Sequence, residues 1–212
     1  PHLEAMRRYC SRIEAVKLTK RQSYVNCLQG ALTTMPFQCV YYRSQEMRRK
    51  IRQLLKGASF DLLHMWPIRV AQYVDCFDSL PAVVDYVDCK TMYHRRALET
   101  QRNPIQWFLN FQEWRKMRRY EVETSRRFAR CILISEVDKQ YLESRGGVSN
   151  LAVVPNGIDL SYFKPMPEYP LERDSLAFVG TMDVHWNIDA ALFFCRRILP
   201  EVRKKVPGAK LY

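Results

Sequence analysis

The chain contains 212 residues, of which 47% are hydrophobic and 26% are charged, and its formal net charge is +12. The proportions are ordinary for a soluble globular protein, and the charge favours an anionic partner: a phosphate-bearing substrate, an anionic membrane surface or nucleic acid. The seven scattered cysteines lack a C-x-x-C pair, which disfavours a disulfide framework or a zinc site, and the longest apolar runs are too short to span a bilayer.

The first third of the chain predicts mixed local structure. Residues 1–15 have the three- and four-residue apolar spacing of a helix end. Pro1 is not an initiator residue, so we expect part of the N-terminus to be absent. Three weaker patterns follow: an alternating strand at 14–18, a helical or irregular segment at 21–35 and a short strand at 40–42. Residues 44–55 then predict a basic amphipathic helix that Gly57 ends as a C-cap.

Strands and helices alternate through the middle of the chain. Short, nearly continuous apolar runs predict strands at 60–65, 82–88, 131–135 and 151–154. Helices are predicted between them at 68–76, 105–129 and 136–144, the last ended by Gly146-Gly147. This alternation predicts an α/β fold with a Rossmann-like parallel sheet and helices on both faces.

The stretch 151–165 predicts the end of one domain and the start of a linker. Pro155 removes a backbone donor from the strand, and Asn156-Gly157 allows a sharp change of direction, so this pair is the candidate hinge. The pattern then restarts with a strand at 176–179, a loop at 180–186, a helix at 187–199 and a strand at 209–212. We therefore expect an N-terminal domain at 1–158, a linker at 159–174 and the beginning of a second Rossmann-like domain at 175–212.

Several stretches carry a resemblance to a known family. They are "VPNGIDLSYFKP" (154–165), "FDLLHMW" (60–66), "PAVVDYVD" (81–88), the block 118–142 and the block 176–212. Together they resemble the GT-B glycosyltransferases of family 4, and most closely the bacterial sugar transferases associated with exopolysaccharide (PEP-CTERM/exosortase) systems. The resemblance implies a retaining transfer of a sugar from a nucleotide-sugar donor to a glycan or lipid-linked acceptor, with no cofactor and no metal.

The chain also departs from that family pattern. The first strand with its glycine-rich loop is not found, nor is the E-x7-E element that in the family holds the donor sugar and ribose. The stretch 180–187 lacks the Arg and Lys that many relatives use for the donor diphosphate, so Gly180, Thr181 and Asn187 would bind phosphate through backbone N–H groups and the helix N-terminus. We therefore expect the 212 residues alone not to transfer sugar.

The acceptor-side candidates lie where strands end. Asp85 and Asp88 close the 82–88 strand, where ligands bind in open α/β sheets, and a carboxylate there can orient or deprotonate an acceptor hydroxyl. The alternative for Asp88 is a cap on the following helix, and many relatives have a histidine at that position. His94 is a weaker cleft candidate, with a loop histidine as the alternative. His64 is either a cleft residue or a hydrogen-bonded core histidine.

Other features of the sequence keep two interpretations each. Ser135 and Glu136 lie either at the cleft rim or only at the cap of the 136–144 helix. Gly180 either allows the backbone to approach a phosphate closely or is only a turn glycine. The aromatic and basic segment 107–130 is either a membrane-interface element or a helix packed on its own sheet.

Sequence motifs also help to judge the alternative functional classes. The alternatives to an enzyme are a non-catalytic GT-B-like protein or a basic α/β module that binds nucleic acid or a membrane. Nucleic acid is disfavoured, because no RNP, zinc-finger or helix-turn-helix pattern is present, and a dinucleotide oxidoreductase would need a G-x-G-x-x-G motif. We expect a cytoplasmic protein, peripheral at the inner face of the membrane.

Overall fold

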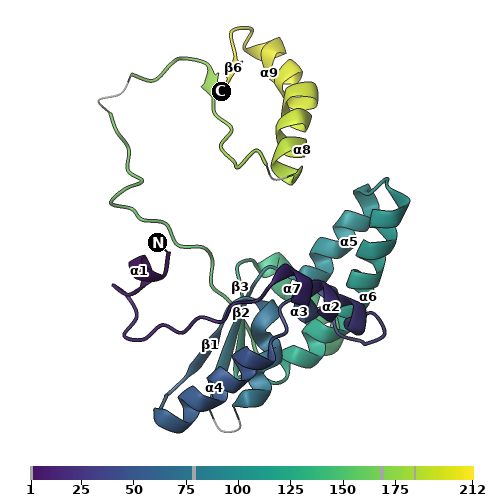
Figure 1. The fold of residues 1–212 in the computed structure, drawn as a ribbon. Helices are drawn as coiled ribbons and strands as arrows, with labels where there is room; N and C mark the ends of the chain where they lie inside the picture. Colours follow the sequence, from purple (N-terminus) through teal and green to yellow (C-terminus); the bar gives the residue numbers. More distant parts are fainter. Residues whose placement is uncertain (1, 78–79, 168–169, 184) are drawn as a thin grey trace. The chain divides into compact units, whose positions relative to one another are not determined.

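In a computed structural model, the chain forms two compact units, residues 1–157 and residues 158–212 (Figure 1). The structure describes residues 2–77, 80–167, 170–183 and 185–212. Among the described residues, no helix has the length and apolar character needed to cross a bilayer.

The first unit is built on a parallel sheet with the order β1-β2-β3-β4. Its strands are β1 (Leu63–Met65), β2 (Ala82–Val87), β3 (Arg130–Leu133) and β4 (Leu151–Val153). Val84 in β2 pairs with Met65 on one side and with Cys131 on the other, and Cys131 pairs with Leu151. The predicted α/β class, with a four-stranded parallel sheet flanked by helices, is confirmed.

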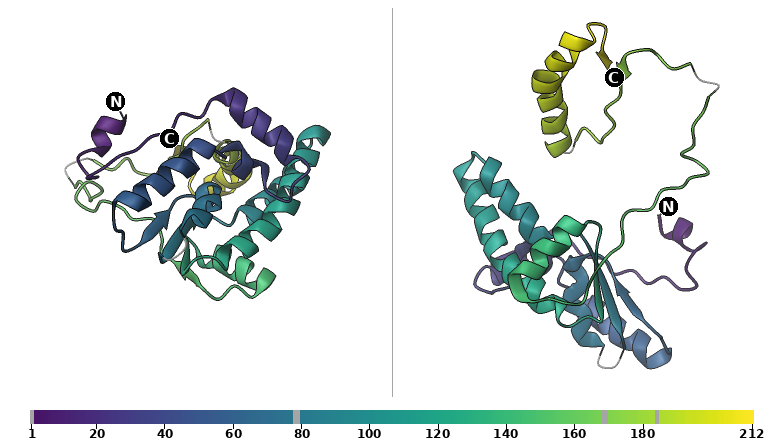
Figure 2. Two further views of the ribbon diagram at one scale, coloured as in Figure 1. Left: turned by 60° about the horizontal axis from the view of Figure 1, so that its bottom comes forward. Right: turned by 180° about the vertical axis from the view of Figure 1, so that it is seen from behind.

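Helices connect these strands and precede them. They are α1 (His2–Met6), α2 (Lys20–Gly30), α3 (Phe37–Tyr41), α4 (Gln45–Gly57), the 3-10 helix η1 (Ile68–Cys76), α5 (Lys90–Thr100), α6 (Pro104–Ser125) and α7 (Glu136–Gly146). The strands follow one another in chain order, so right-handed crossovers place η1, α5, α6 and α7 on the same face of the sheet. Figure 2 shows the same arrangement from two further sides.

Burial of the strand residues is correspondingly one-sided. Along β2, alternate residues from Ala82 to Tyr86 are buried, whereas Val83, Asp85 and Val87 on the other face are only half-buried. His64 in β1, which pairs with Val83, is exposed. The face opposite the crossover helices is therefore less covered than the prediction of helices on both faces implies.

Several local predictions were wrong, mostly before the sheet. Residues 14–18 form no strand, and of residues 1–15 only His2–Met6 is described as helix. Residues 40–42 are not a strand, because Val40 and Tyr41 belong to α3, whose N-terminus is held by a distant carboxylate. Gly57 is the last residue of α4 rather than a left-handed cap beyond it. No range was predicted for α5, the helix that follows Asp88.

The long helix α6 buries charged side chains against the ends of other helices. Glu113 accepts the backbone N–H groups of Phe37 at 2.7 Å and of Gln38 at 3.1 Å, at the start of α3. Lys116 donates to the carbonyl oxygens of Gly30 at 3.0 Å and of Ala31, at the end of α2. Carboxylates are thus placed at a helix N-terminus and an ammonium at a C-terminus, as the helix dipole favours.

Glu121, further along α6, makes the same kind of contact with α5. It is fully buried, and its two oxygens accept the backbone N–H groups of Lys90 at 2.6 Å and of Thr91 at 2.9 Å. Burial raises the pKa of this carboxyl, and the hydrogen bonds from Thr91, Lys90 and Cys89 limit the rise. The start of α5 is therefore fixed by a residue some thirty positions later in the chain.

The second unit is small. The strands β5 (Ser175–Leu176) and β6 (Lys210–Leu211) pair in parallel. Between them lie α8 (His185–Phe193), the π-helix η2 (Phe194–Ile198) and α9 (Leu199–Lys205). The predicted strand–helix–strand order is confirmed, with shorter strands and a longer helical segment than the sequence patterns indicated.

Removal of the Glu121 carboxylate should destabilise the first unit strongly. Glu121→Ala leaves the buried N–H groups of Lys90 and Thr91 without an acceptor, so the free energy of unfolding should fall by about 3 kcal/mol. The matched control is Glu123→Ala, which removes an exposed i,i+4 ion pair with Arg119 and should hardly change the free energy of unfolding. Urea unfolding of both variants measures the difference, and equal losses would contradict this role for Glu121.

Candidate functional site

The carboxyl end of β2 has an unusual backbone. Val87 has φ = 67°, in the left-handed region that a β-branched residue rarely occupies, and the pairing register with β3 shifts between Asp85 and Val87. The Asp85 carboxylate accepts the Val87 N–H at 2.9 Å, and the Asp88 N–H donates to the Tyr86 carbonyl oxygen at 2.9 Å. These contacts hold a tight bend that ends the strand and presents Asp88.

Asp88 directly follows the carboxyl end of β2, an inner strand of the sheet, and its side chain is 46% exposed. Its carboxylate contacts the Lys90 ammonium at 3.2 Å, and the Lys90 side chain is mostly buried beside the Tyr93 ring. Asp88 does not cap α5, because Cys89 is the N-cap residue and the N–H groups of Lys90 and Thr91 bond to Glu121. The carboxylate of Asp88 is thus paired but open to a ligand.

The carboxyl end of β3 lies next to this bend. Ser135 accepts the Asp138 N–H at 3.1 Å and donates to the Asp138 carboxylate, so its predicted role as the cap of α7 is confirmed. Asp138 is buried and accepts the Cys89 N–H at 3.3 Å, which ties the start of α7 to the end of β2. Glu136 is exposed and forms an ion pair with Lys139 at 3.5 Å.

The two histidines occupy different environments. His64 lies within β1, on the less covered face, with an exposed side chain, so the interpretation as a core histidine was wrong. His94 belongs to α5 rather than to a loop, is 9% exposed, and its Nε2 lies 3.1 Å from the Gln38 amide nitrogen. Burial lowers the pKa of His94, and Glu113 and Asn110 oppose this only in part. His94 is therefore a packing residue between α5 and α3.

The remaining candidates lie after the sheet. Asn156 and Gly157 are exposed and follow β4, and the boundary between the two compact units falls immediately after Gly157. In the second unit the Asn187 amide donates to the Thr181 carbonyl oxygen at 3.0 Å, and a side chain at Gly180 would meet Asn187 at 3.1 Å. The structure thus brings Gly180, Thr181 and Asn187 together.

Three residues that surround Asp88 were missed from the sequence. Lys90 pairs with Asp88 two positions away, a spacing that could have indicated the contact. Asp138 stands three residues after Ser135 in a Ser-x-x-Asp capping motif, but its bond to Cys89 depends on the fold. Nothing local relates Glu121 to α5. Among the described residues, no group of three His, Cys, Asp or Glu is placed to hold a metal ion.

Comparison with known proteins identifies the family. The model of glycosyltransferase family 4 matches residues 9–162, which is most of the chain. The chain belongs to glycosyltransferase family 4. No curated protein and no solved structure gives a significant match. Membership supports an enzyme of the transferase class that uses a nucleotide-sugar donor and a glycan acceptor.

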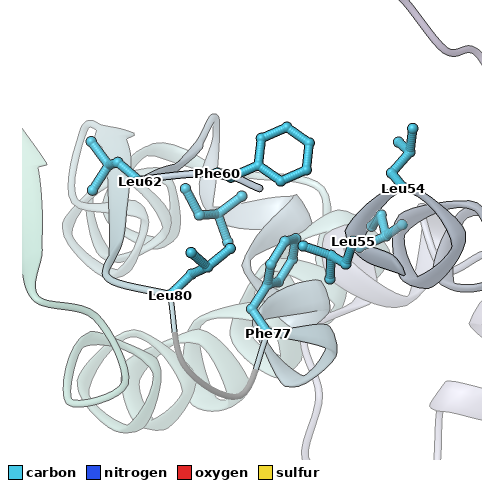
Figure 3. Close-up of a pocket in the computed structure, with 8 residues that line it drawn as sticks. Leu54, Leu55, Phe60, Leu62, Phe77 and Leu80 are labelled. Atoms are coloured by element: carbon cyan, nitrogen blue, oxygen red, sulfur yellow. The ribbon is translucent and has the colours of Figure 1, made fainter. Parts of the chain in front are cut away.

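A family 4 glycosyltransferase must hold polar sugar and phosphate groups, and one cavity of the first unit does not suit them. This cavity of about 200 Å³ lies between α4 and the amino ends of β1 and β2 (Figure 3). Its lining is entirely apolar: Ile51, Leu54, Leu55, Phe60, Leu62, Leu63, Phe77 and Leu80. A sugar there would lose its hydrogen bonds to water without replacement. Asp88, at the opposite edge of the sheet, is the better placed candidate.

The strain at Val87 can be tested with glycine. Val87→Gly loses about 1 kcal/mol of half-buried side chain but relieves about 1–2 kcal/mol of left-handed strain, so the free energy of unfolding should hardly change. Val83→Gly, at a half-buried position on the same face of the same strand, loses side-chain burial without any strain to relieve. It should cost about 2 kcal/mol. If chemical denaturation gives the same loss for both, Val87 is not strained.

The burial of His94 predicts a pH dependence. Because its pKa is lowered in the folded state, the stability it contributes is present above the unfolded value of about 6.5 and is lost as pH falls. His94→Gln should therefore flatten the decline in the free energy of unfolding between about pH 7 and pH 5. His64→Gln, at the exposed strand position, is the matched control for the removal of a histidine side chain. Urea titrations at each pH would show an unchanged slope for His94→Gln if burial has no such effect.

Proposed function

We propose that this protein is a retaining glycosyltransferase of polysaccharide biosynthesis, related to the exopolysaccharide-associated enzymes. It transfers a sugar from a nucleotide-sugar donor to a glycan or lipid-linked acceptor, at the cytoplasmic surface of a membrane. Family membership supports the reaction class. The chemistry of the first unit supports the acceptor side, because its exposed carboxylate lies at the carboxyl edge of a parallel sheet, where such folds bind ligands.

The observation that carries this proposal is the way Asp88 is presented. A strained backbone at Val87 turns the chain, the Glu121 and Asp138 carboxylates fix the N–H groups that follow, and Asp88 is left with Lys90 as its partner. Strain of this kind costs free energy and tends to occur at functional sites. Several buried bonds are thus arranged around one half-exposed carboxylate.

In the proposed mechanism, Asp88 accepts a hydrogen bond from the acceptor hydroxyl. The acceptor oxygen forms its bond to the anomeric carbon on the face from which the nucleoside diphosphate departs with the bonding electrons, so the configuration is retained. The hydroxyl proton moves toward the carboxylate in the same step. Lys90 holds the carboxylate in position. Asp85 supports the bend through its bond to Val87, and Ser135 and Glu136 form the neighbouring rim at the end of β3.

The donor side is assigned to the second unit. Residues 1–158 would bind the acceptor, residues 159–174 would link the units, with Asn156-Gly157 as the hinge, and residues 175–212 would contribute to donor binding. There the backbone around Gly180 and Thr181, held by the Asn187 amide, would face the donor diphosphate. The reaction assigned here uses no cofactor and no metal.

Replacement of Asp88 tests the acceptor-side assignment. In the full-length gene product, Asp88→Asn should lower kcat by about 100-fold while KM for the donor changes little, because only proton transfer is impaired. Stability should be nearly unchanged, since the side chain is half exposed. Turnover is followed as nucleoside diphosphate release with a panel of nucleotide sugars.

Glu123→Gln is the matched control, because Glu123 is an exposed carboxylate of α6 that pairs with Arg119 and has no place in the proposed site. It should stay within a few-fold of wild type. If Asp88→Asn also stays within a few-fold, Asp88 has no catalytic role. If the wild-type protein turns over no nucleotide sugar, the proposed transfer itself is wrong.

A further inference from the structure

The helices α5 and α6 form a hairpin that projects from the rest of the first unit (Figures 1 and 2). Three residues, 101–103, join the helices. The turn is well hydrogen-bonded: the Asn103 carboxamide oxygen caps α6 by accepting the N–H groups of Ile105 and Gln106, and Gln101 donates to Gln106. The end of the hairpin is therefore a defined structure rather than a loose loop.

The end of this hairpin exposes large apolar side chains. Ile105 is 72% exposed, Trp107 41%, and Phe108 and Leu109 54% each. We call these four residues the apolar tip. Further along α6 the pattern reverses, because Met117 is fully buried and the Trp107 ring stacks on Phe111. The sequence left open whether segment 107–130 packs on the sheet or lies in a membrane interface. In the structure the later part of this segment is buried, and its first residues are exposed.

The apolar side chains of the tip are spread over more than half of the helix circumference, and Gln106 lies in the remaining sector. At about 100° per residue, Ile105 and Leu109 lie on one side, Phe108 lies next to them, and Trp107 points to the opposite side. A single flat protein surface could contact only one side of such a helix. Immersion in an apolar medium would bury all four side chains at once.

Basic residues surround the base of the tip. From residue 91 to residue 115 the exposed charged side chains are Arg95, Arg96, Arg102 and Arg115, with Glu99 as the only acid among them. Arg95 pairs with Glu99 at 3.6 Å, so the local charge remains clearly positive. An apolar end with a basic collar matches an anionic membrane, where apolar side chains enter the headgroup region and arginines meet lipid phosphates. Nucleic acid would match the arginines but not the aliphatic side chains.

We propose that the apolar tip inserts into the interface of an anionic lipid bilayer and anchors the first unit there. This inference goes beyond sugar transfer and rests on the proposed membrane location only for its biological use. Vesicle binding needs no donor, acceptor or turnover, so a failure of the anchor and a failure of the transferase activity are measured separately.

Vesicle cosedimentation tests the anchor. The wild-type chain should bind vesicles of phosphatidylcholine with about one quarter phosphatidylglycerol, and binding should weaken with salt and on pure phosphatidylcholine. Trp107→Ser/Phe108→Ser should lower the partition coefficient at least about 30-fold, and Arg95→Gln/Arg96→Gln by about 10-fold on the anionic vesicles only. Brominated lipids should quench wild-type fluorescence more than that of Trp107→Phe.

The matched control is Tyr24→Ser/Leu28→Ser, because these side chains are 62% and 77% exposed on α2, outside the hairpin. Its vesicle binding should equal that of wild type, and unchanged thermal melting of all variants confirms that each one folds. Absence of wild-type binding, or equal losses from the tip and control variants, would overturn the proposal. So would a wild-type dimer in light scattering that the tip substitutions convert to a monomer, since the tip would then be a contact between copies.

Discussion

The first unit depends on charged side chains of α6 that are buried against the ends of other helices. Glu113 meets the N-terminus of α3, Lys116 the C-terminus of α2, and Glu121 the N-terminus of α5. Buried charges are costly unless hydrogen bonds compensate them, and helix ends are rich in unpaired backbone groups. Each contact therefore supplies hydrogen-bond partners to the buried charge and caps the helix end at the same time. The cost is that neither member of a pair can be removed alone.

The same contacts shape the candidate site. Because Glu121 accepts the N–H groups of Lys90 and Thr91, Asp88 is not needed as a cap and stays available for a ligand at the carboxyl end of β2. Asp138 fixes Cys89 from the side of β3, so the bend after β2 is held from two neighbouring elements. A left-handed valine can persist only where its surroundings determine the backbone this firmly. The stability of the core and the geometry of the site thus share the same hydrogen bonds.

These hydrogen bonds join residues far apart in the sequence, and this decides which features the sequence could predict. The four strands were recognised to within a few residues because buried parallel strands are nearly continuously apolar, and α7 was recognised because Ser135 and Gly147 cap it locally. The cap of α5 was sought at Asp88 because its true partner, Glu121, is distant in sequence, and Val40-Tyr41-Tyr42 resembled a strand because the carboxylate that starts α3 lies more than seventy residues away. Asp88 could be found from its place at a strand end, whereas Glu121 and Asp138 could not, since only the folded chain brings them to it.

The two ends of α5 connect the site with the hairpin tip. Lys90, which pairs with Asp88, is the first residue of this helix, and Thr100, next to the tip, is the last. Eleven residues of α-helix span about 16 Å, so the carboxylate lies roughly that far along the hairpin from the apolar side chains. With the tip at headgroup depth, Asp88 would face water within a few sugar lengths of the membrane surface. If both proposals hold, a lipid-linked acceptor would suit that geometry better than a free glycan, because its membrane anchor and its reacting hydroxyl would reach the tip and the site of the same unit together.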